Sequence, residues 1–589
     1  MEQGVSLPYT GRMLRTLSIL LLGIAPCSLF AQSATSPIQT FFQQAFEQHL
    51  RDEPEFATNV GRHEYDDRWT DFSKAGRDRR RAHLQQELQT LATFPVAGLS
   101  PQDRLSARLM DYNLRLRLDA FDLEDELFAV MQQNGLHNAV YSTIDRMPAR
   151  TVHDYENLLA RLRAVPAYID QSIAMLNDAI AHGMAQPKIV VDLVTQQLDG
   201  QIAQNRNSTR LLAAFRNFPS NIPAAEQTRL RAEAGDVYDR QFLPAWRQFR
   251  DYLTGTYARS VRATAGVSSI PNGRNAYATL VRFYTTTTTS PEEIHKLGLA
   301  EVYRIENEMR TVIREAGFSG SIADYERQLE SSPDQHFRNK QEMLEYARNV
   351  AKIVEPELPS QFRHIPQLLY GIRPIPVERE AATATNAQPP APDFSAPGWM
   401  NLNTYQPEKQ VKYDKQALVL HEAVPGHIFQ LTLARALTGI PDFRRFYSNS
   451  AYVEGWGLYA ESLGSQLGVY RDPASHFGQL ASERFRAVRL VVDTGLHSMG
   501  WTRQQAIEYF QAHAPTESLA EVDRYIAWPG QALSYKMGQL RIRQLRAEAE
   551  QKLGPRFDIR EFHDVILRDG VLPLDLLQQQ VEDWLRAAR

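Results

Sequence analysis

The sequence predicts a mainly α-helical protein with a small β-sheet, and three observations support this fold class. Apolar residues recur at three- and four-residue steps through most of the chain, as in RRAHLQQELQTLATF at 80–94. Proline and glycine mark the joints between these segments, and few stretches alternate as strands do. The 589 residues are 43% hydrophobic and 23% charged, a composition that can bury a large core.

The first 31 residues have the pattern of a secretory signal peptide. Two arginines precede an apolar run at 17–24, which is too short to cross a bilayer, and small residues follow. We expect cleavage near Ala31. The one cysteine, Cys27, could alternatively carry a lipid anchor, but Pro26 departs from the small residue usual before a lipidated cysteine. An exported, periplasmic or secreted chain without disulfides is therefore expected.

After this segment, residues 32–589 are expected to form one helical domain with three parts. The first part, 32–365, is helical, and Ser290 and Glu293 predict a capping box at one helix start. In the second part, 366–404, PQLLYGIRPIPVERE and GWMNLNTY flank an Ala/Pro-rich loop, which predicts two short strands. The third part, 405–589, is helical again.

The charge distribution excludes one class of partner. The net charge is −4, and no run of basic residues forms the footprint that nucleic acids or acidic lipids require. No segment after the leader is apolar for long enough to span a membrane. We therefore expect neither a nucleic-acid partner nor a stable membrane span.

The stretch HEAVPGH, 421–427, resembles the zinc motif H-E-x-x-H with two extra residues. In a regular helix His427 would lie roughly 120° away from His421 around the axis, too far for both to bind one ion. Pro425 and Gly426 can interrupt the helix, because proline removes a backbone donor and glycine accepts unusual conformations. Looping them out restores the spacing, whereas an unrelated pair of histidines is the alternative.

A third ligand is expected from YVEGWGLYAESLG. Glu454 is surrounded there by large apolar residues, where an unpaired carboxylate would be costly to bury. Glu461 follows two helical turns later on the same face and can accept a hydrogen bond from a ligand histidine. The two glutamates could exchange these roles, or both could face solvent.

Four motifs in order, HEAVPGH, VEGWGLYAE, RLVVDTGLHSMGWTRQQAI and RYIAWPGQALSYKMG, make the chain resemble a bacterial family called domain of unknown function 885. That family belongs with the gluzincin metallopeptidases. The resemblance implies a helical, deep-cleft zincin-like fold similar to angiotensin-converting enzyme and related oligopeptidases, with a small sheet near a Zn²⁺ site. It implies that His421, His427 and Glu454 bind zinc and that Glu422 is the catalytic glutamate.

We therefore expect an exported zinc peptidase acting on small peptides. Glu422 would take a proton from the attacking water, and Tyr535, or second Tyr525, would stabilise the oxyanion. His497 is a further candidate donor, oriented by Asp493 if they share a helix; a hydrogen-bonded core histidine is equally consistent.

Arg524 and Lys536 are candidate anchors for a substrate carboxylate, although surface salt bridges explain them equally well. The strand expected at 399–404 could pair with an extended substrate. Two other functions stay open: an amide hydrolase of a cell-wall or other non-standard peptide, and a noncatalytic peptide-binding protein. The presence of Glu422 argues against the second, because metal binding does not need it.

Overall fold

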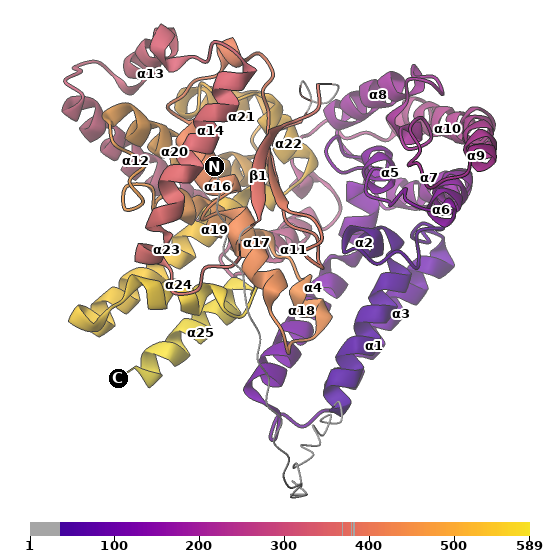
Figure 1. Cartoon of the computed structure of the whole chain (residues 1–589), viewed down its shortest axis with the longest axis horizontal. Helices are drawn as coiled ribbons and strands as arrows, with labels where there is room; N and C mark the ends of the chain where they lie inside the picture. Colours follow the sequence, from indigo (N-terminus) through magenta and orange to yellow (C-terminus); the bar gives the residue numbers. More distant parts are fainter. Residues whose placement is uncertain (1–35, 368, 378–379, 381–382, 589) are drawn as a thin grey trace, which may run out of the picture.

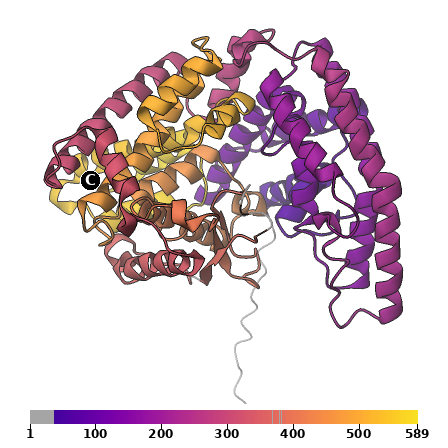
Figure 2. The ribbon, with the colours of Figure 1, turned by 90° about the horizontal axis from the view of Figure 1, so that it is seen from above.

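The computed structural model describes residues 36–367, 369–377, 380 and 383–588, and it is mainly helical, as the periodicity predicts. The signal peptide, with Cys27 and the expected cleavage site, lies outside the described residues. Helices α1 to α10 lie on one side of the molecule and most helices after α11 on the other, in two perpendicular views (Figures 1 and 2).

The first fifteen α-helices are α1 (Pro37–Asp52), α2 (Pro54–Asn59), α3 (Lys74–Leu91), α4 (Pro101–Phe128), α5 (Leu136–Ile144), α6 (Val152–Arg163), α7 (Val165–Ala181), α8 (Lys188–Ile202), α9 (Ala224–Val237), α10 (Leu243–Thr254), α11 (Gly273–Thr285), α12 (Pro291–Glu315), α13 (Ile322–Ser331), α14 (Lys340–Val354) and α15 (Leu358–Gln361). The remaining helices are α16 (Lys415–Glu422), α17 (His427–Ala436), α18 (Asp442–Arg445), α19 (Ser450–Glu461), α20 (Pro473–His497), α21 (Arg503–His513), α22 (Ala520–Ala527), α23 (Ser534–Leu553), α24 (Ile559–Leu567) and α25 (Leu574–Ala587).

The helix start predicted at Ser290 is confirmed. The Ser290 hydroxyl accepts from the Glu293 backbone N–H, and the Glu293 carboxylate accepts from the Ser290 backbone N–H. Both bonds satisfy amide groups that the first turn of α12 leaves without helical partners.

The described residues form one sheet of three strands, β1 (Tyr370–Pro374), β2 (Asn386–Gln388) and β3 (Gly398–Leu402). Strand β3 is central: it pairs in parallel with β1 and antiparallel with β2. Met400 lies opposite Ile372 in one neighbour and Ala387 in the other. The small sheet was predicted, but its third strand was not.

Two details of the strand prediction are wrong. Strand β2 was missed because three residues in an Ala/Pro-rich segment carry no alternation of their own, so only pairing with β3 defines it. The strand predicted at 399–404 was suggested as one that could pair with a substrate, yet β3 (Gly398–Leu402) already uses both of its edges for β1 and β2. An extended ligand therefore has no free edge on β3.

The helices of the C-terminal half pack at unusually short distances where glycines meet. A Cβ atom at Gly455 on α19 would lie 2.4 Å from the Cα of Gly538 on α23. A Cβ atom at Gly538 would in turn lie 1.8 Å from the carbonyl oxygen of Ala451. Backbone thus contacts backbone between α19 and α23, which fixes these two helices relative to each other.

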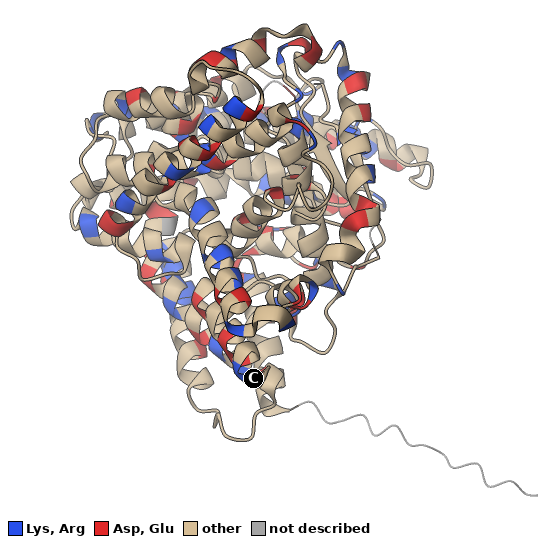
Figure 3. Ribbon diagram, turned by 90° about the vertical axis from the view of Figure 1, so that its left-hand side faces the viewer, with Lys and Arg blue, Asp and Glu red and all other residues tan. Residues whose placement is uncertain are grey.

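The surface carries charges of both signs. Figure 3 shows lysine and arginine interspersed with aspartate and glutamate along the helices of the face drawn. None of the described helices is both long enough and apolar enough to cross a bilayer.

Candidate metal centre

The HEAVPGH stretch forms a broken helix. Helix α16 ends at Glu422 and α17 begins at His427, so the expected loop takes the form of a full interruption. A Cβ atom at Gly426 would lie 1.8 Å from the carbonyl oxygen of His421. Because backbone occupies the space where a side chain would lie, only glycine fits this connection.

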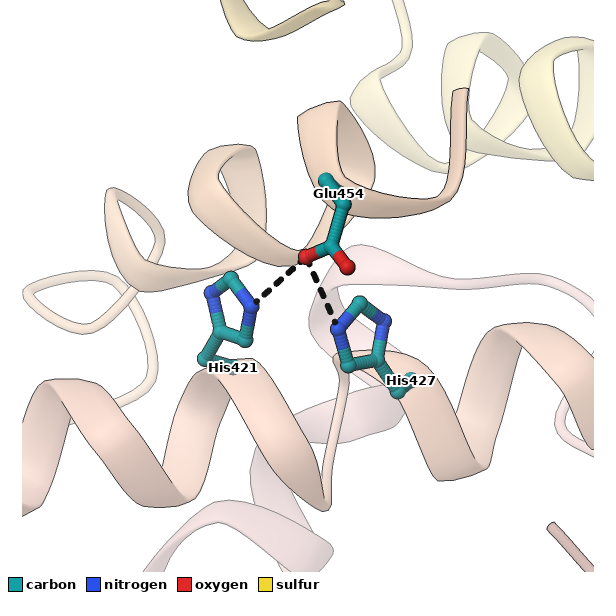
Figure 4. Close-up of side chains that lie close together, drawn as sticks. All are labelled: His421, His427 and Glu454. Atoms are coloured by element: carbon teal, nitrogen blue, oxygen red, sulfur yellow. Dashed lines mark hydrogen bonds and ion pairs between the residues drawn. The ribbon is translucent and has the colours of Figure 1, made fainter. Parts of the chain in front are cut away.

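The break brings the two histidines to the same carboxylate. Nε2 of His421 and Nε2 of His427 each lie 3.4 Å from Oε2 of Glu454, which α19 supplies (Figure 4). The two imidazole side chains are 3% and 9% exposed, whereas Glu454 is 22% exposed. The group is therefore buried on its histidine side and accessible on its glutamate side.

A second carboxylate orients the first histidine. His421 Nδ1–H donates to Oε1 of Glu461, which is fully buried, at 2.8 Å. This bond leaves Nε2 as the ring nitrogen that is directed toward Glu454. A Cβ atom at Gly457, between the two glutamates in α19, would lie 2.8 Å from the His421 ring. The motif EGWG thus provides both a candidate ligand and the space for the opposing imidazole.

The electrostatics of the group favour positive charge. Burial lowers the pKa of His421, but Glu454 and Glu461 outweigh it and raise the value to about 9. Burial raises the pKa of Glu454, yet the adjacent His427 and His421 together hold it well below its usual range. A cation at this point would be stabilised by the same carboxylates.

The three ligand atoms fit a divalent metal ion. His421, His427 and Glu454 each offer one donor atom, and the three atoms lie within 4.8 Å of one another. Ligands about 2.0–2.1 Å from a tetrahedral zinc ion are separated by about 3.3 Å, close to the 3.4 Å measured between each histidine and the carboxylate. Two imidazoles and one carboxylate are a donor set that suits zinc.

Glu422, the last residue of α16, is half-buried beside this group. Burial raises the pKa of its carboxyl, and the neighbouring His427 and His421 partly oppose that rise. It follows His421 directly in sequence and is partly exposed.

Tyr535, on α23, lies beside the candidate metal centre formed by His421, His427 and Glu454. Its ring stacks on that of His421 with centroids 6.5 Å apart and an interplanar angle of 20°. The guanidinium of Arg489 lies over the tyrosine ring at 4.3 Å from its centroid. Burial and the negative charge of Glu454 raise the pKa of Tyr535, so its hydroxyl stays protonated and able to donate.

Tyr525 and Arg524, on α22, share a hydrogen-bond partner in Glu521. The Tyr525 hydroxyl donates to Glu521 at 2.8 Å and accepts from Arg489 Nε at 3.1 Å. Arg524 donates to Glu521 and, through Nη1, to Gln531 at 2.7 Å. Tyr525 is thus already hydrogen-bonded to charged groups, whereas the ring of Tyr535 contacts that of His421.

His497 and Asp493 do not form the expected pair. His497 accepts from the backbone N–H of Val267 at 3.0 Å and donates through Nε2 to the Tyr525 carbonyl at 2.9 Å. Asp493 instead accepts from the Tyr277 hydroxyl and the Gly530 backbone N–H. Both ring nitrogens of His497 are therefore hydrogen-bonded to backbone groups, as expected for a core histidine. Burial lowers the pKa of its imidazole to about 3.

Lys536 is not available to a substrate. Its ammonium is fully buried and donates to Glu483 at 2.7 Å and Gln539 at 2.7 Å, with Glu301 at 2.9 Å. The preceding residue, Tyr535, faces His421 of the candidate metal centre. Lys536 therefore lies on a different face of α23. Its ion pairs instead connect α23 to α20 and α12.

The family of bacterial proteins of unknown function called DUF885 matches residues 54–581. The chain belongs to the DUF885 family. The resemblance based on the four motifs is thereby confirmed at the level of the family. No curated protein matches the chain.

Two solved structures share the fold of this DUF885 protein. A "putative lipoprotein" from Colwellia psychrerythraea is 26% identical, with a TM-score of 0.89 over 93% of this chain and 99% of that one. A "putative lipoprotein of unknown function" from Shewanella oneidensis is 18% identical, with a TM-score of 0.72 over 92% and 99% of the two chains. Both support the helical architecture across nearly the whole DUF885 chain.

Sequence reasoning missed two charged residues beside the candidate centre of this DUF885 protein. Arg489 and Glu521 are both largely buried and connect Tyr525, Arg524 and Tyr535. Arg489 lies within the quoted motif RLVVDTGLH, but a lone arginine in a helical pattern gives no signal of burial. Only the packing of α20 against α22 and α23 reveals its position.

Proposed function

We propose that this DUF885 protein is an exported zinc-dependent peptidase that hydrolyses peptide bonds of small peptides. The observation that carries the proposal is the convergence of His421, His427 and Glu454 with Glu422 adjacent. Two histidines and a glutamate would hold the ion, and a bound zinc ion supplies a Lewis acid and lowers the pKa of a water ligand.

The protein's own residues would divide the remaining work. Glu422 accepts the proton of the attacking water and transfers it to the departing amine. Tyr535 donates a hydrogen bond to the carbonyl oxygen as negative charge develops there. Glu461 holds the His421 ring in the tautomer that keeps Nε2 free to bind. Arg524 remains a candidate anchor for a substrate carboxylate, with Arg489 beside it.

Export is supported by the leader pattern at 1–31. The two similar proteins are named as lipoproteins, which gives weight to lipid anchoring at Cys27. Fractionation of cells producing the full chain and a Cys27→Ser variant distinguishes the two routes. A wild-type protein in the membrane fraction and a variant in the soluble fraction would support the anchor, and equal soluble fractions would contradict it.

The test of the peptidase proposal combines metal content with turnover. We expect elemental analysis to find about one zinc per chain, and a His427→Ala variant with an unchanged circular dichroism spectrum to lose it. A Glu422→Gln variant should retain zinc but cleave a peptide library about 10²- to 10⁴-fold more slowly. Glu408→Gln, an exposed change, is the matched control. Zinc-loaded protein that cleaves nothing would instead support a peptide-binding role.

A further inference from the structure

A large cavity is lined by residues other than those of the candidate metal centre. Its volume is about 560 Å³, within the range of small-molecule binding sites. Helices α1 to α5 form most of its wall, and α11 and the segment after α18 close it. Aromatic rings make up much of the lining, including Phe46 and Phe446, which stack with centroids 5.9 Å apart.

The charged groups in this wall do not balance. Four carboxylates, those of Glu53, Glu55, Glu87 and Asp125, face two guanidinium groups, those of Arg80 and Arg117. The one histidine, on α1, is neutral, because burial lowers its pKa to about 4. The lining therefore carries an excess of negative charge among aromatic rings.

Three of the four carboxylates have partners within the protein. Glu53 pairs with Arg117, and Asp125 pairs with Arg80 at 2.8 Å. Glu55 accepts from the backbone N–H and the hydroxyl of Thr70. These contacts explain why the three groups are present and leave them little capacity for a ligand.

Glu87, on α3, differs from the other three. It makes no hydrogen bond or ion pair with another residue in the described part of the chain, although it is half-buried in the cavity wall. Burial raises the pKa of its carboxyl to about 7, and the positive charge of Arg117, which pairs with Glu53, partly opposes that rise. Because no protein group hydrogen-bonds to its oxygens, the Glu87 carboxylate is available to pair directly with a cationic ligand.

The cavity adjoins the element that carries the third metal ligand. Its wall ends at Ser448, and α19 begins two residues later at Ser450. Glu454 is the fourth residue after Ser450, about 6 Å further along the helix axis. Phe283, another wall residue, lies on α11, which packs against both α19 and α23. The cavity wall is therefore connected to the candidate metal centre through α11 and the start of α19.

We propose that this cavity binds the ammonium group of a ligand with an aromatic or apolar body. Glu87 provides the negative charge for the ammonium group, and the surrounding rings contact both the cation and the apolar body. Two sources share this chemistry: a free aromatic amine, and the N-terminal residue of a peptide. The peptide source rests on the proposed peptidase function, whereas the binding site itself does not.

Calorimetry tests ligand binding to the cavity directly. The Glu422→Gln protein is used, because it lacks the proposed catalytic glutamate and should not cleave a peptide probe. The probes are 2-phenylethylamine, the carboxylate 3-phenylpropionate and the neutral 2-phenylethanol. We expect the amine to bind at least 10-fold more tightly than the carboxylate. Adding Glu87→Gln should weaken amine binding about 10-fold and leave 2-phenylethanol unchanged, while the exposed change Glu64→Gln has no effect.

Two further experiments test where the probes bind and whether the natural ligand is a free amine or a peptide N-terminus. Ala139→Phe narrows the cavity from α5 and should weaken binding of all three probes. The peptide Phe-Ala-Ala binding more tightly than 2-phenylethylamine, with loss on N-acetylation, identifies a peptide N-terminus; binding of the free amine alone identifies a small amine. Equal binding of amine and carboxylate, an ineffective Glu87→Gln, or no binding overturns the proposal. Because no cleavage is measured, this result is independent of peptidase activity.

Discussion

Glu461 accepts a hydrogen bond from His421 Nδ1 at 2.8 Å, seven residues after Glu454 on the same helix. One helix therefore supplies both a candidate metal ligand and the group that orients a second ligand. The spacing of two helical turns places the carboxylates on one face, so a single packing interaction positions both.

Replacing Glu461 should weaken metal binding without removing a ligand. In Glu461→Gln the side-chain amide no longer favours a positive imidazole, and we expect zinc affinity to fall about 10- to 100-fold. Competition with a chromophoric chelator measures this change. The exposed substitution Glu408→Gln should leave affinity unaltered. Equal zinc affinities for the Glu461 variant and the parent would show that Glu461 does not support metal binding.

Gly426→Ala should disrupt the connection between the two histidines. The new methyl group would overlap the backbone carbonyls of His421 and Leu420, so either α17 shifts or the fold is strained. We expect loss of bound zinc and a fall in stability of several kcal/mol. Gly200→Ala is the matched control, because α8 leaves open space there and helix propensity predicts a gain of about 0.5–1 kcal/mol.

Stability should depend on pH through Asp493. Burial raises the pKa of this carboxyl from 3.8 to about 7, so the folded protein retains a proton that the unfolded chain releases. Its stabilising effect is complete below about pH 4 and is lost as pH rises through about 7, up to about 4 kcal/mol in all. Asp493→Asn should flatten this dependence in urea titrations from pH 4 to 8. Asp178→Asn, at an exposed position, should retain the slope.

Removing Lys536 should affect stability rather than substrate binding. Lys536→Met leaves the buried Glu483 with only Arg304 and Arg543 as cationic partners. We expect a loss of about 3 kcal/mol in urea unfolding, because a buried charge loses a direct partner. Lys552→Met, which breaks an exposed pair with Glu548, should change stability by about 0.5 kcal/mol or less. A raised KM with unchanged stability would favour a substrate-anchoring role.

The sequence predicted the helical class because periodicity reports the buried face of each helix directly. It also predicted that HEAVPGH would be interrupted, because Pro425 and Gly426 act locally on the backbone. Glu454 was identified from its apolar neighbours, a signal contained within one helix. These successes share a feature: each depends on residues close together in the chain.

The errors depend on contacts between distant segments. The partners of Asp493 are Tyr277 and Gly530, which no spacing rule connects to it. Strand β2 exists only through its pairing with β3. Arg489 and Lys536 resemble surface charges in sequence, and only tertiary packing shows that they are buried. Local sequence patterns therefore identified the candidate ligands, whereas tertiary packing was needed to identify their neighbours.

The direct contact of backbone at Gly455 and Gly538 has an evolutionary consequence. Because neither position has room for a methyl group, a substitution at one cannot be compensated at the other. Drift that alters the surrounding helices should therefore leave these two glycines unchanged in DUF885 proteins. They should persist even in lineages that have lost the candidate metal ligands. Their retention there would show that helix packing, not metal binding, requires them.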